Sequence, residues 1–296
     1  MSAPEVERSH EQQAVEAVVD SHVHVWDPTR VHYPWLAEAR SLDRRFDLGD
    51  VEAELDAAGV DRVVLVQAAD DLDDTGFMLE VAAASPRVAG VVGWVPLLDP
   101  AAAERSLDRW REQPIVGVRH LVHRDPDPDL LVDRRIDDVL AMLSERRLTF
   151  DVCAETEHLL RLVPDLAQRQ PNLTLVIDHL AKPPIAAGAW QPWAQLLADA
   201  AAMPNTVVKL SGLNTAAAPR ASADDYRRYV DHALEVFGPE RTMYGGDWPF
   251  ALLAADSYTE IWRDLRACLD DLDAAGRHAV LAGTAQRTYR LPIVVR

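Results

Sequence analysis

Several features that would place the chain in a particular class of protein are scarce or missing. Only two cysteines occur in 296 residues, Cys153 and Cys268, and no C-x-x-C spacing is present. This argues against a disulfide framework and a thiolate zinc site, and it favours reduced thiols in a cytoplasmic protein. No run approaches the roughly 18 apolar residues of a membrane helix. The first residues, MSAPEVERSHEQQAVEA, lack the apolar core of a secretion signal, so we expect residues 1–16 to be a flexible leader.

Positive charge is also scarce. Lys and Arg number 30 against 48 Asp and Glu, which gives a formal net charge of −18 with neutral histidines. Such a surface repels nucleic-acid phosphates and anionic lipid, so we expect neither nucleic acid nor a membrane as a partner. The acidic residues are spread along the chain, as on the solvated surface of a soluble protein. The expected partner is a small molecule, and a homo-oligomer is left open.

Short, nearly continuous apolar segments alternate with longer amphipathic stretches along the chain. Nearly continuous apolar runs are typical of parallel strands that are buried on both faces. The strand-like segments are residues 18–25, 61–67, 88–95, 115–121, 148–154, 173–179, 206–212 and 241–247. The helix-like stretches are residues 50–59, 73–85, 100–112, 130–147, 157–170, 190–203, 222–237 and 256–275. Eight strands, each followed by a helix, predict a single α/β domain over residues 17–296, a (β/α)8 TIM barrel.

The main alternative to a barrel is an open, doubly wound sheet. That fold usually carries a G-x-G-x-x-G fingerprint after its first strand, and none is present here. No break in composition and no linker rich in Gly or Ser divides the chain. A single barrel is therefore the simplest interpretation.

Polar residues gather where predicted strands end. His22 and His24 lie two residues apart in the first strand, so both side chains point to the same side. His179 ends the sixth strand and Asp247 the eighth, next to the first strand in a closed barrel. Barrel enzymes keep their active sites at this end of the strands. An H-x-H pair alone is as typical of two core histidines, but four such residues at one end favour an active site.

Nine segments, spread in order from about residue 18 to residue 292, carry a resemblance to a known family. They are VVDSHVHVWDP, YPWL, VLVQAADD, VAGVVGWVPLLDP, GVRH, LVIDHLAKPPI, VVKLSGL, DHALEVFGPERTMYGGDWPF and LAGTAQRTYRLP. Together they resemble the amidohydrolase superfamily. Within it they are most similar to the sugar-lactone lactonases, the group of L-fuconolactonase, L-rhamnonolactonase and 2-pyrone-4,6-dicarboxylate lactonase. Each segment alone is modest evidence, whereas their ordered spacing is specific.

The resemblance implies roles for the clustered residues. Asp247 would be the general base that takes a proton from the hydrolytic water. The histidines His22, His24 and His179 would either hold one divalent metal together with Asp247, zinc being the expected ion, or polarise the lactone carbonyl without a metal.

Two-metal members of the superfamily use a Lys or Glu on strand four and a His on strand five. Here strand four offers Arg119 and His120, and strand five offers Cys153 and Glu155. The two-metal site therefore looks incomplete, which leaves one metal or none.

Further residues near the predicted strand ends are candidates for binding substrate, although each also suits an ion pair, a loop anchor or core packing. They are Arg119, His120, Glu155, Lys182, Trp26, Gln67 and Trp248. Glu155 also suits a metal ligand, and Tyr33 and Trp35 are lid candidates. The expected reaction is the opening of a small lactone to its hydroxy acid. A neutral sugar aldonolactone is favoured over a dicarboxylate, because only Arg119 and Lys182 are well placed cations. The alternatives are a metal-dependent decarboxylase or amidase and, from another class, a non-catalytic sugar-binding protein.

Overall fold

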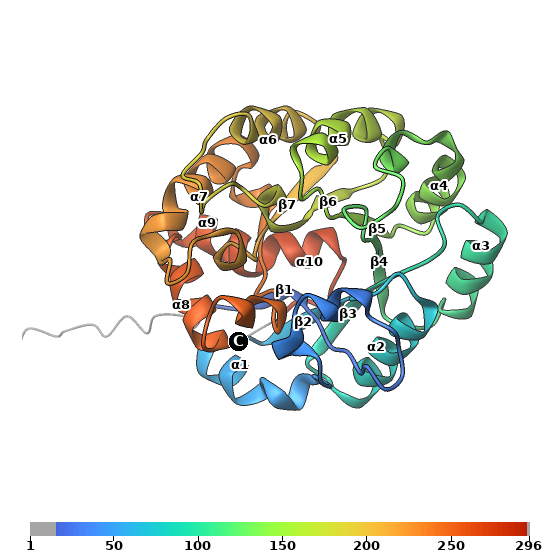
Figure 1. The fold of residues 1–296 in the computed structure, drawn as a ribbon, viewed down its shortest axis with the longest axis horizontal. Helices are drawn as coiled ribbons and strands as arrows, with labels where there is room; N and C mark the ends of the chain where they lie inside the picture. The colour runs from blue at the N-terminus through green and yellow to red at the C-terminus, as the bar shows by residue number, and fades with distance from the viewer. Residues whose placement is uncertain (1–15, 295–296) are drawn as a thin grey trace, which may run out of the picture.

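A ring of eight parallel strands forms the centre of the computed structural model, which describes residues 16–294 (Figure 1). The strands follow one another around the ring in chain order. They are β1 (Val19–Val23), β2 (Arg62–Val66), β3 (Val88–Gly93), β4 (Ile115–His120), β5 (Thr149–Val152), β6 (Leu175–Ile177), β7 (Thr206–Leu210) and β8 (Thr242–Tyr244). Each lies within a segment predicted from the sequence. The prediction of a (β/α)8 barrel is confirmed, whereas residues 1–15, most of the predicted leader, lie outside the described residues.

Helices surround the ring on its outer side (Figure 1). They are α1 (Glu52–Ala58), α2 (Leu72–Ala84), α3 (Pro100–Arg109), α4 (Asp137–Glu145), α5 (Glu157–Arg169), α6 (Trp193–Ala201), α7 (Ala223–Phe237), α8 (Tyr258–Ala267) and the shorter α9 (Ala274–His278), whereas the last helix, α10 (Thr284–Thr288), is not part of this outer layer. Local sequence explains where several begin. Asp99 accepts a hydrogen bond from Ala102 N at 2.9 Å, directly before Pro100 opens α3. Ser222 and Asp225 form a capping box at the start of α7.

Two of the predicted helices differ from the structure. The stretch 130–147 is helical only from Asp137, because Asp133 accepts a hydrogen bond from Arg135 N and two short 3-10 turns precede α4. The stretch 256–275 is divided, since α8 ends at Ala267 and Asp273 caps the new helix α9. In both places an aspartate offers the backbone a local partner that competes with a continuous helix.

The ring closes where β1 meets the residues after β8. Asp247 N donates to His22 O at 2.8 Å, and His24 N donates to Trp248 O at 2.7 Å. A Cβ on Gly245 would lie 2.7 Å from the Cβ of His22, so this close approach of the two segments requires glycine. The first and last strands are therefore joined directly beside the predicted active site.

A buried aspartate, Asp20, strengthens the closure of the ring between β1 and the residues after β8. The Asp20 carboxylate accepts hydrogen bonds from His22 N at 2.9 Å, Gly246 N at 2.8 Å and the Tyr258 hydroxyl at 2.7 Å. One side chain thus ties together β1, the segment after β8 and α8. These bonds fix the position of His22 and His24 along the barrel axis relative to Asp247.

The inner face of the ring is filled by a separate apolar cluster. Val64 and Val66 belong to it, whereas Val63 and Leu65 pack outward against the helices, as the alternation of a strand requires. The C-terminal segment adds Ala282, Ala285, Tyr289 and Leu291 to the same inner cluster, and Figure 1 draws α10 across the middle of the ring. Among residues 16–294, no helix is long and apolar enough to cross a membrane.

Candidate active site

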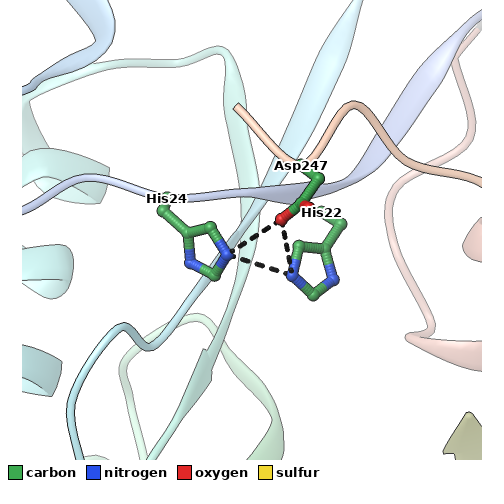
Figure 2. A group of neighbouring side chains, drawn as sticks. All are labelled: His22, His24 and Asp247. Carbon is green, nitrogen blue, oxygen red and sulfur yellow. Dashed lines mark hydrogen bonds and ion pairs between the residues drawn. The ribbon is translucent and has the colours of Figure 1, made fainter. Parts of the chain in front are cut away.

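The four residues singled out at the strand ends lie together. His22 Nε2 is 3.1 Å from His24 Nε2, and Asp247 Oδ1 lies 3.8 Å from the first and 3.4 Å from the second (Figure 2). His179 approaches from β6, with Nε2 at 3.9 Å from Asp247 Oδ1. All four side chains are buried. The cluster thus combines residues from the first, sixth and eighth strands.

Unusual backbone holds two of these side chains. Asp247 has a φ of 55°, and His179 begins four consecutive residues with positive φ, of 54°, 51°, 56° and 49° through Lys182. Left-handed backbone costs an L-residue roughly 1–2 kcal/mol, so the surrounding contacts must over-determine this turn. Gly212 at φ 58° lies against it, where a Cβ would come within 2.7 Å of Asp247 Oδ2 and 2.8 Å of His179 Nδ1.

Backbone and hydroxyl partners fix the orientation of the histidine rings. His24 Nδ1 lies 2.7 Å from Val66 O, and a carbonyl can only accept, so His24 donates from Nδ1. In neutral His24 the other nitrogen, Nε2, then carries a lone pair that faces Asp247 and His22. His179 Nδ1 lies 2.8 Å from Ser211 Oγ, which holds its Nε2 toward Asp247.

Burial and neighbouring charge set the ionisation of the cluster. Burial alone would raise the pKa of Asp247, but His179, His24 and Lys182 outweigh it and lower the pKa to about 2. Burial lowers the pKa of His24 from its ordinary value, and it lowers those of His22 and His179 well below theirs. At neutral pH the cluster is an ionised carboxylate among neutral imidazoles, which suits a base or a metal ligand.

A cavity of about 110 Å³ opens above this cluster. Its wall consists of His24, Trp26, Trp35, Ala68, Arg119, Leu121, His123, Arg124, Glu155, His179, Asp247 and Phe250. Of the predicted substrate contacts, Arg119, Glu155 and Trp26 therefore line the cavity. Arg119 reaches it while its Nη1 donates to Asp178 Oδ2 at 3.0 Å and its Nη2 donates to Gln67 O at 2.5 Å.

The other four predicted substrate contacts have partners elsewhere and do not line this cavity. His120 bonds to Trp94 and Asp125, and Lys182 donates to Gly212 O and Thr215 Oγ1. Gln67 donates to Asp70 and to Arg119 O, and the ring of Trp248 packs edge-on against Phe46. Contact between substrate and these four residues stays a prediction.

The two residues named as lid candidates are tied to the next loop. The Tyr33 hydroxyl donates to Asp74 Oδ1 at 2.7 Å, and Trp35 Nε1 donates to Ala68 O at 2.8 Å. Both side chains are buried. They connect the loop after β1 to the loop after β2 and to α2, in which Asp74 lies, and Trp35 also forms part of the cavity wall.

Four polar residues at the site were missed in the sequence, and two of them, His123 and Arg124, line the cavity. His123 Nδ1 has no hydrogen-bond partner among residues 16–294. Lys209 and Asp178 are fully buried beneath His22, with Lys209 Nζ at 3.0 Å and Asp178 Oδ1 at 3.4 Å from His22 Nδ1. A charged residue inside an apolar strand segment is rarely buried without a partner, and this signal could have pointed to both.

The donor atoms fit one metal ion. His22, His24 and Asp247 offer two nitrogens and an oxygen separated by 3.1, 3.4 and 3.8 Å. Ligands around tetrahedral zinc, with bonds of about 2.0–2.1 Å, lie roughly 3.3–3.4 Å apart. Asp247 Oδ2, moreover, is buried without a hydrogen-bond partner among the described residues. His179 falls instead in a second possible donor group, with His22 and Asp178.

Comparison with known proteins gives consistent matches over nearly the whole chain. The amidohydrolase family model matches residues 19–291. L-fucono-1,5-lactonases of Burkholderia multivorans and Burkholderia ambifaria are 36% and 33% identical, covering 93% and 92% of this chain and 96% and 95% of their own lengths. A crystal structure of an amidohydrolase from Burkholderia multivorans with bound zinc has a TM-score of 0.86 and 34% identity, covering 93% of this chain and all of the other. The chain belongs to the amidohydrolase family, as its sequence segments predicted.

Proposed function

We propose that the protein hydrolyses a small lactone, of the sugar aldonolactone class, to the corresponding hydroxy acid. The observation that carries this is Asp247, a buried and ionised carboxylate in the cavity wall with an oxygen that lacks a partner among residues 16–294. Such an oxygen is suited to take a proton from water. The two relatives that are L-fucono-1,5-lactonases support the same reaction.

The chemistry needs one proton carrier and one group that stabilises negative charge. Asp247 takes a proton from a water molecule, whose oxygen attacks the lactone carbonyl carbon. The guanidinium of Arg119, in the cavity wall, stabilises the charge that develops on the carbonyl oxygen. When the ring C–O bond breaks, the alkoxide leaving group takes the proton back from Asp247, so the base is regenerated.

A metal would have a place in this site. His22, His24 and Asp247 would hold it, and when bound it would supply a Lewis acid that polarises the carbonyl. The zinc in the amidohydrolase of Burkholderia multivorans supports this arrangement. Arg119 lies in the same wall and serves the same electrostatic need, so we propose that hydrolysis persists at a measurable rate without metal.

The cavity favours a neutral polyol over a dicarboxylate. Arg119 is already paired with Asp178, and Arg124 is paired with Glu38 at 3.2 Å. Glu155, in the same wall, accepts hydrogen bonds from hydroxyl groups and repels a carboxylate. A ring that carries hydroxyls and no charge is therefore the expected ligand.

The test is acid release from a panel of aldonolactones, measured with a pH indicator before and after chelator treatment. L-fucono-1,5-lactone, which the names of both relatives specify, is the first member. We expect hydrolysis of at least one aldonolactone. Turnover only of a pyrone dicarboxylate, an amide or an aromatic carboxylate would overturn the proposal in favour of an amidase or decarboxylase, and binding without any turnover would favour a sugar-binding protein.

A further inference from the structure

The ammonium group of Lys209 is fully buried inside the barrel, beside His22. Lys209 rises from β7, and its Nζ lies 2.6 Å from Asp151 Oδ2, 3.1 Å from Asp178 Oδ1 and 3.0 Å from His22 Nδ1. An ammonium has three N–H donors and cannot accept. Lys209 donates to Asp151 Oδ2 and, when His22 Nδ1 carries a lone pair, to that nitrogen, while Asp178 Oδ1 forms an ion pair with the ammonium.

This arrangement determines where the proton of His22 sits. If Nδ1 accepts from Lys209, neutral His22 carries its proton on Nε2. That nitrogen lies 3.1 Å from His24 Nε2. His24 Nε2 carries a lone pair, because His24 donates from its Nδ1 to Val66 O at 2.7 Å. The bonds then run in one direction, from Lys209 to His22, on to His24 and finally to Val66. The contact that opposes this direction is Arg119 Nη1, a donor 3.4 Å from His22 Nε2, and it is longer than the two bonds at 3.0 and 3.1 Å that His22 makes in this tautomer.

The opposite tautomer of His22 is the one that a metal needs. A metal at Nε2 requires the lone pair there, so the proton must move to Nδ1 and be donated to an acceptor. Asp178 Oδ1 is the available acceptor, but it is farther from Nδ1, at 3.4 Å, than the Lys209 ammonium at 3.0 Å. With the proton on Nδ1, one Lys209 N–H would point at another N–H, and the ammonium would have to turn away.

We infer that Lys209 is a positioning residue that holds His22 in the tautomer protonated at Nε2 and thereby opposes metal binding at this site. The ammonium also lies beside the second possible donor group, that of His22, Asp178 and His179, and contacts two of its members. It is thus a cation supplied by the chain at the place where a second metal would bind. Lys209 and Asp178 compete for the same nitrogen, and the outcome sets the affinity of the site for zinc.

The tautomer can be read directly in the unaltered protein. Imidazole nitrogens with and without a proton have well-separated nitrogen-15 shifts, so the chelator-treated full chain, labelled at histidine, gives the answer by NMR. The His22→Gln variant serves only to assign the signal. We expect Nδ1 unprotonated and Nε2 protonated, and a His22 ring protonated at Nδ1 would overturn the inference.

Zinc affinity, measured by competition with a chelator, provides the second readout. Lys209→Met should bind zinc at least about tenfold more tightly, because the tautomer that binds metal is no longer opposed, whereas Asp178→Asn should bind about 10–100-fold more weakly, because the acceptor for Nδ1–H is lost. Unchanged or weaker zinc binding by Lys209→Met would overturn the inference. If that variant does not fold, the NMR result on the unaltered chain decides.

The only other lysine of the chain provides a matched control. Lys182 lies near Asp247 but donates to Gly212 O and Thr215 Oγ1 rather than to a histidine. Lys182→Met removes the same charge without freeing His22, so its zinc affinity should rise less than about threefold. An equal rise in both variants would mean that charge alone is responsible. Neither readout uses a lactone, so the inference can hold even if the proposed function fails.

Discussion

Two layers of polar side chains meet at His22, and their hydrogen bonding differs. The pocket layer, consisting of His24, His179, Asp247 and Arg119, lines the cavity, and one carboxylate oxygen of Asp247 lacks a partner among residues 16–294. The buried layer consists of Asp151, Asp178, Lys209 and Tyr289, all within the barrel.

The buried layer is more fully paired, and its one side-chain oxygen without a hydrogen bond among residues 16–294, Asp178 Oδ1, lies in an ion pair 3.1 Å from Lys209 Nζ. Asp151 alone accepts from Thr149, Lys209 and the Tyr289 hydroxyl at 2.9, 2.6 and 2.5 Å. Buried polar groups are usually satisfied, and an exception at a cavity marks a place where a ligand completes the set. The contrast therefore teaches that substitutions in the pocket layer should act on turnover, whereas substitutions deep in the buried layer should act on stability.

The largest effect is expected from Asp247→Asn. The amide cannot take a proton from water, so kcat/KM should fall about 10²–10⁴-fold while binding of the product hydroxy acid stays within a few fold. Steady-state kinetics and calorimetric titration measure the two quantities. The matched control is Asp199→Asn on the outside of α6, where the exposed Asp199 accepts a hydrogen bond from Gln195 at 2.8 Å and its substitution should not affect turnover. Turnover within tenfold of the unaltered enzyme would remove Asp247 from its role as base.

The next largest effect is expected from Arg119→Lys. A lysine keeps the charge but cannot bond to Asp178 and Gln67 O at once with a planar fork, so the charge is no longer fixed in the cavity wall. We expect kcat/KM to fall about 10²-fold, as for the loss of one oxyanion donor. Arg146→Lys, at the surface beside Asp108, is the control that should change nothing. A loss smaller than about threefold in Arg119→Lys would contradict the assignment.

Tyr289→Phe tests the buried layer by itself. Loss of the hydroxyl removes one bond to Asp151, which should lower the free energy of unfolding by about 1–3 kcal/mol and leave kcat/KM within about threefold. Urea unfolding and steady-state kinetics are the measurements. Tyr226→Phe, whose hydroxyl donates to Ala221 O at 3.2 Å near the surface, should cost less. A large loss of turnover with intact stability would erase the distinction between the layers.

A smaller change of opposite sign is expected from Ala181→Gly. Ala181 has a φ of 56° in the left-handed turn after His179, which glycine adopts without strain. The free energy of unfolding should rise by about 0.5–1 kcal/mol, the relief of strain minus the extra entropy of the unfolded chain. Ala198→Gly in α6 should instead destabilise by about 1 kcal/mol. Equal destabilisation in both variants would show that the turn is not strained at this residue.

The smallest effect is expected from acidification. Asp247, with its pKa lowered to about 2, stays ionised as the pH falls, and the histidines, whose pKa values lie below the ordinary 6.5, stay neutral. The kcat/KM of the chelator-treated enzyme should therefore show no fall at the ordinary histidine midpoint of about pH 6.5, and any fall caused by the histidines should come at lower pH. A fall with a midpoint near 6.5 would show a histidine that titrates normally. A pH profile of initial rates is sufficient.

The sequence predicted the pocket layer much better than the buried layer. His22 lies near the end of β1, and His24 and Asp247 follow β1 and β8. The ends of parallel strands in a closed barrel must meet at one rim. Lys209 lies within β7 and Asp178 directly follows β6, and only the register and tilt of the ring decide that their side chains meet beneath the rim. His120 and His123 show the same limit of prediction from sequence. The loop after β4 places His123 in the cavity wall, whereas His120 bonds to Trp94. Local pattern does not determine such a loop.

The closure between β1 and the residues after β8 also has a consequence for biosynthesis. Asp20 accepts a hydrogen bond from the backbone N–H of Gly246, which lies 226 positions later in the chain. During translation, His22 and His24 are among the first residues to leave the ribosome, yet their partner Asp247 is among the last. Contacts of such long sequence separation form late, and a nascent chain exposes unpaired strand edges until they do. The catalytic cluster is thus a product of completed synthesis, and a chain released before residue 247 would contain the three histidines of the cluster and no base.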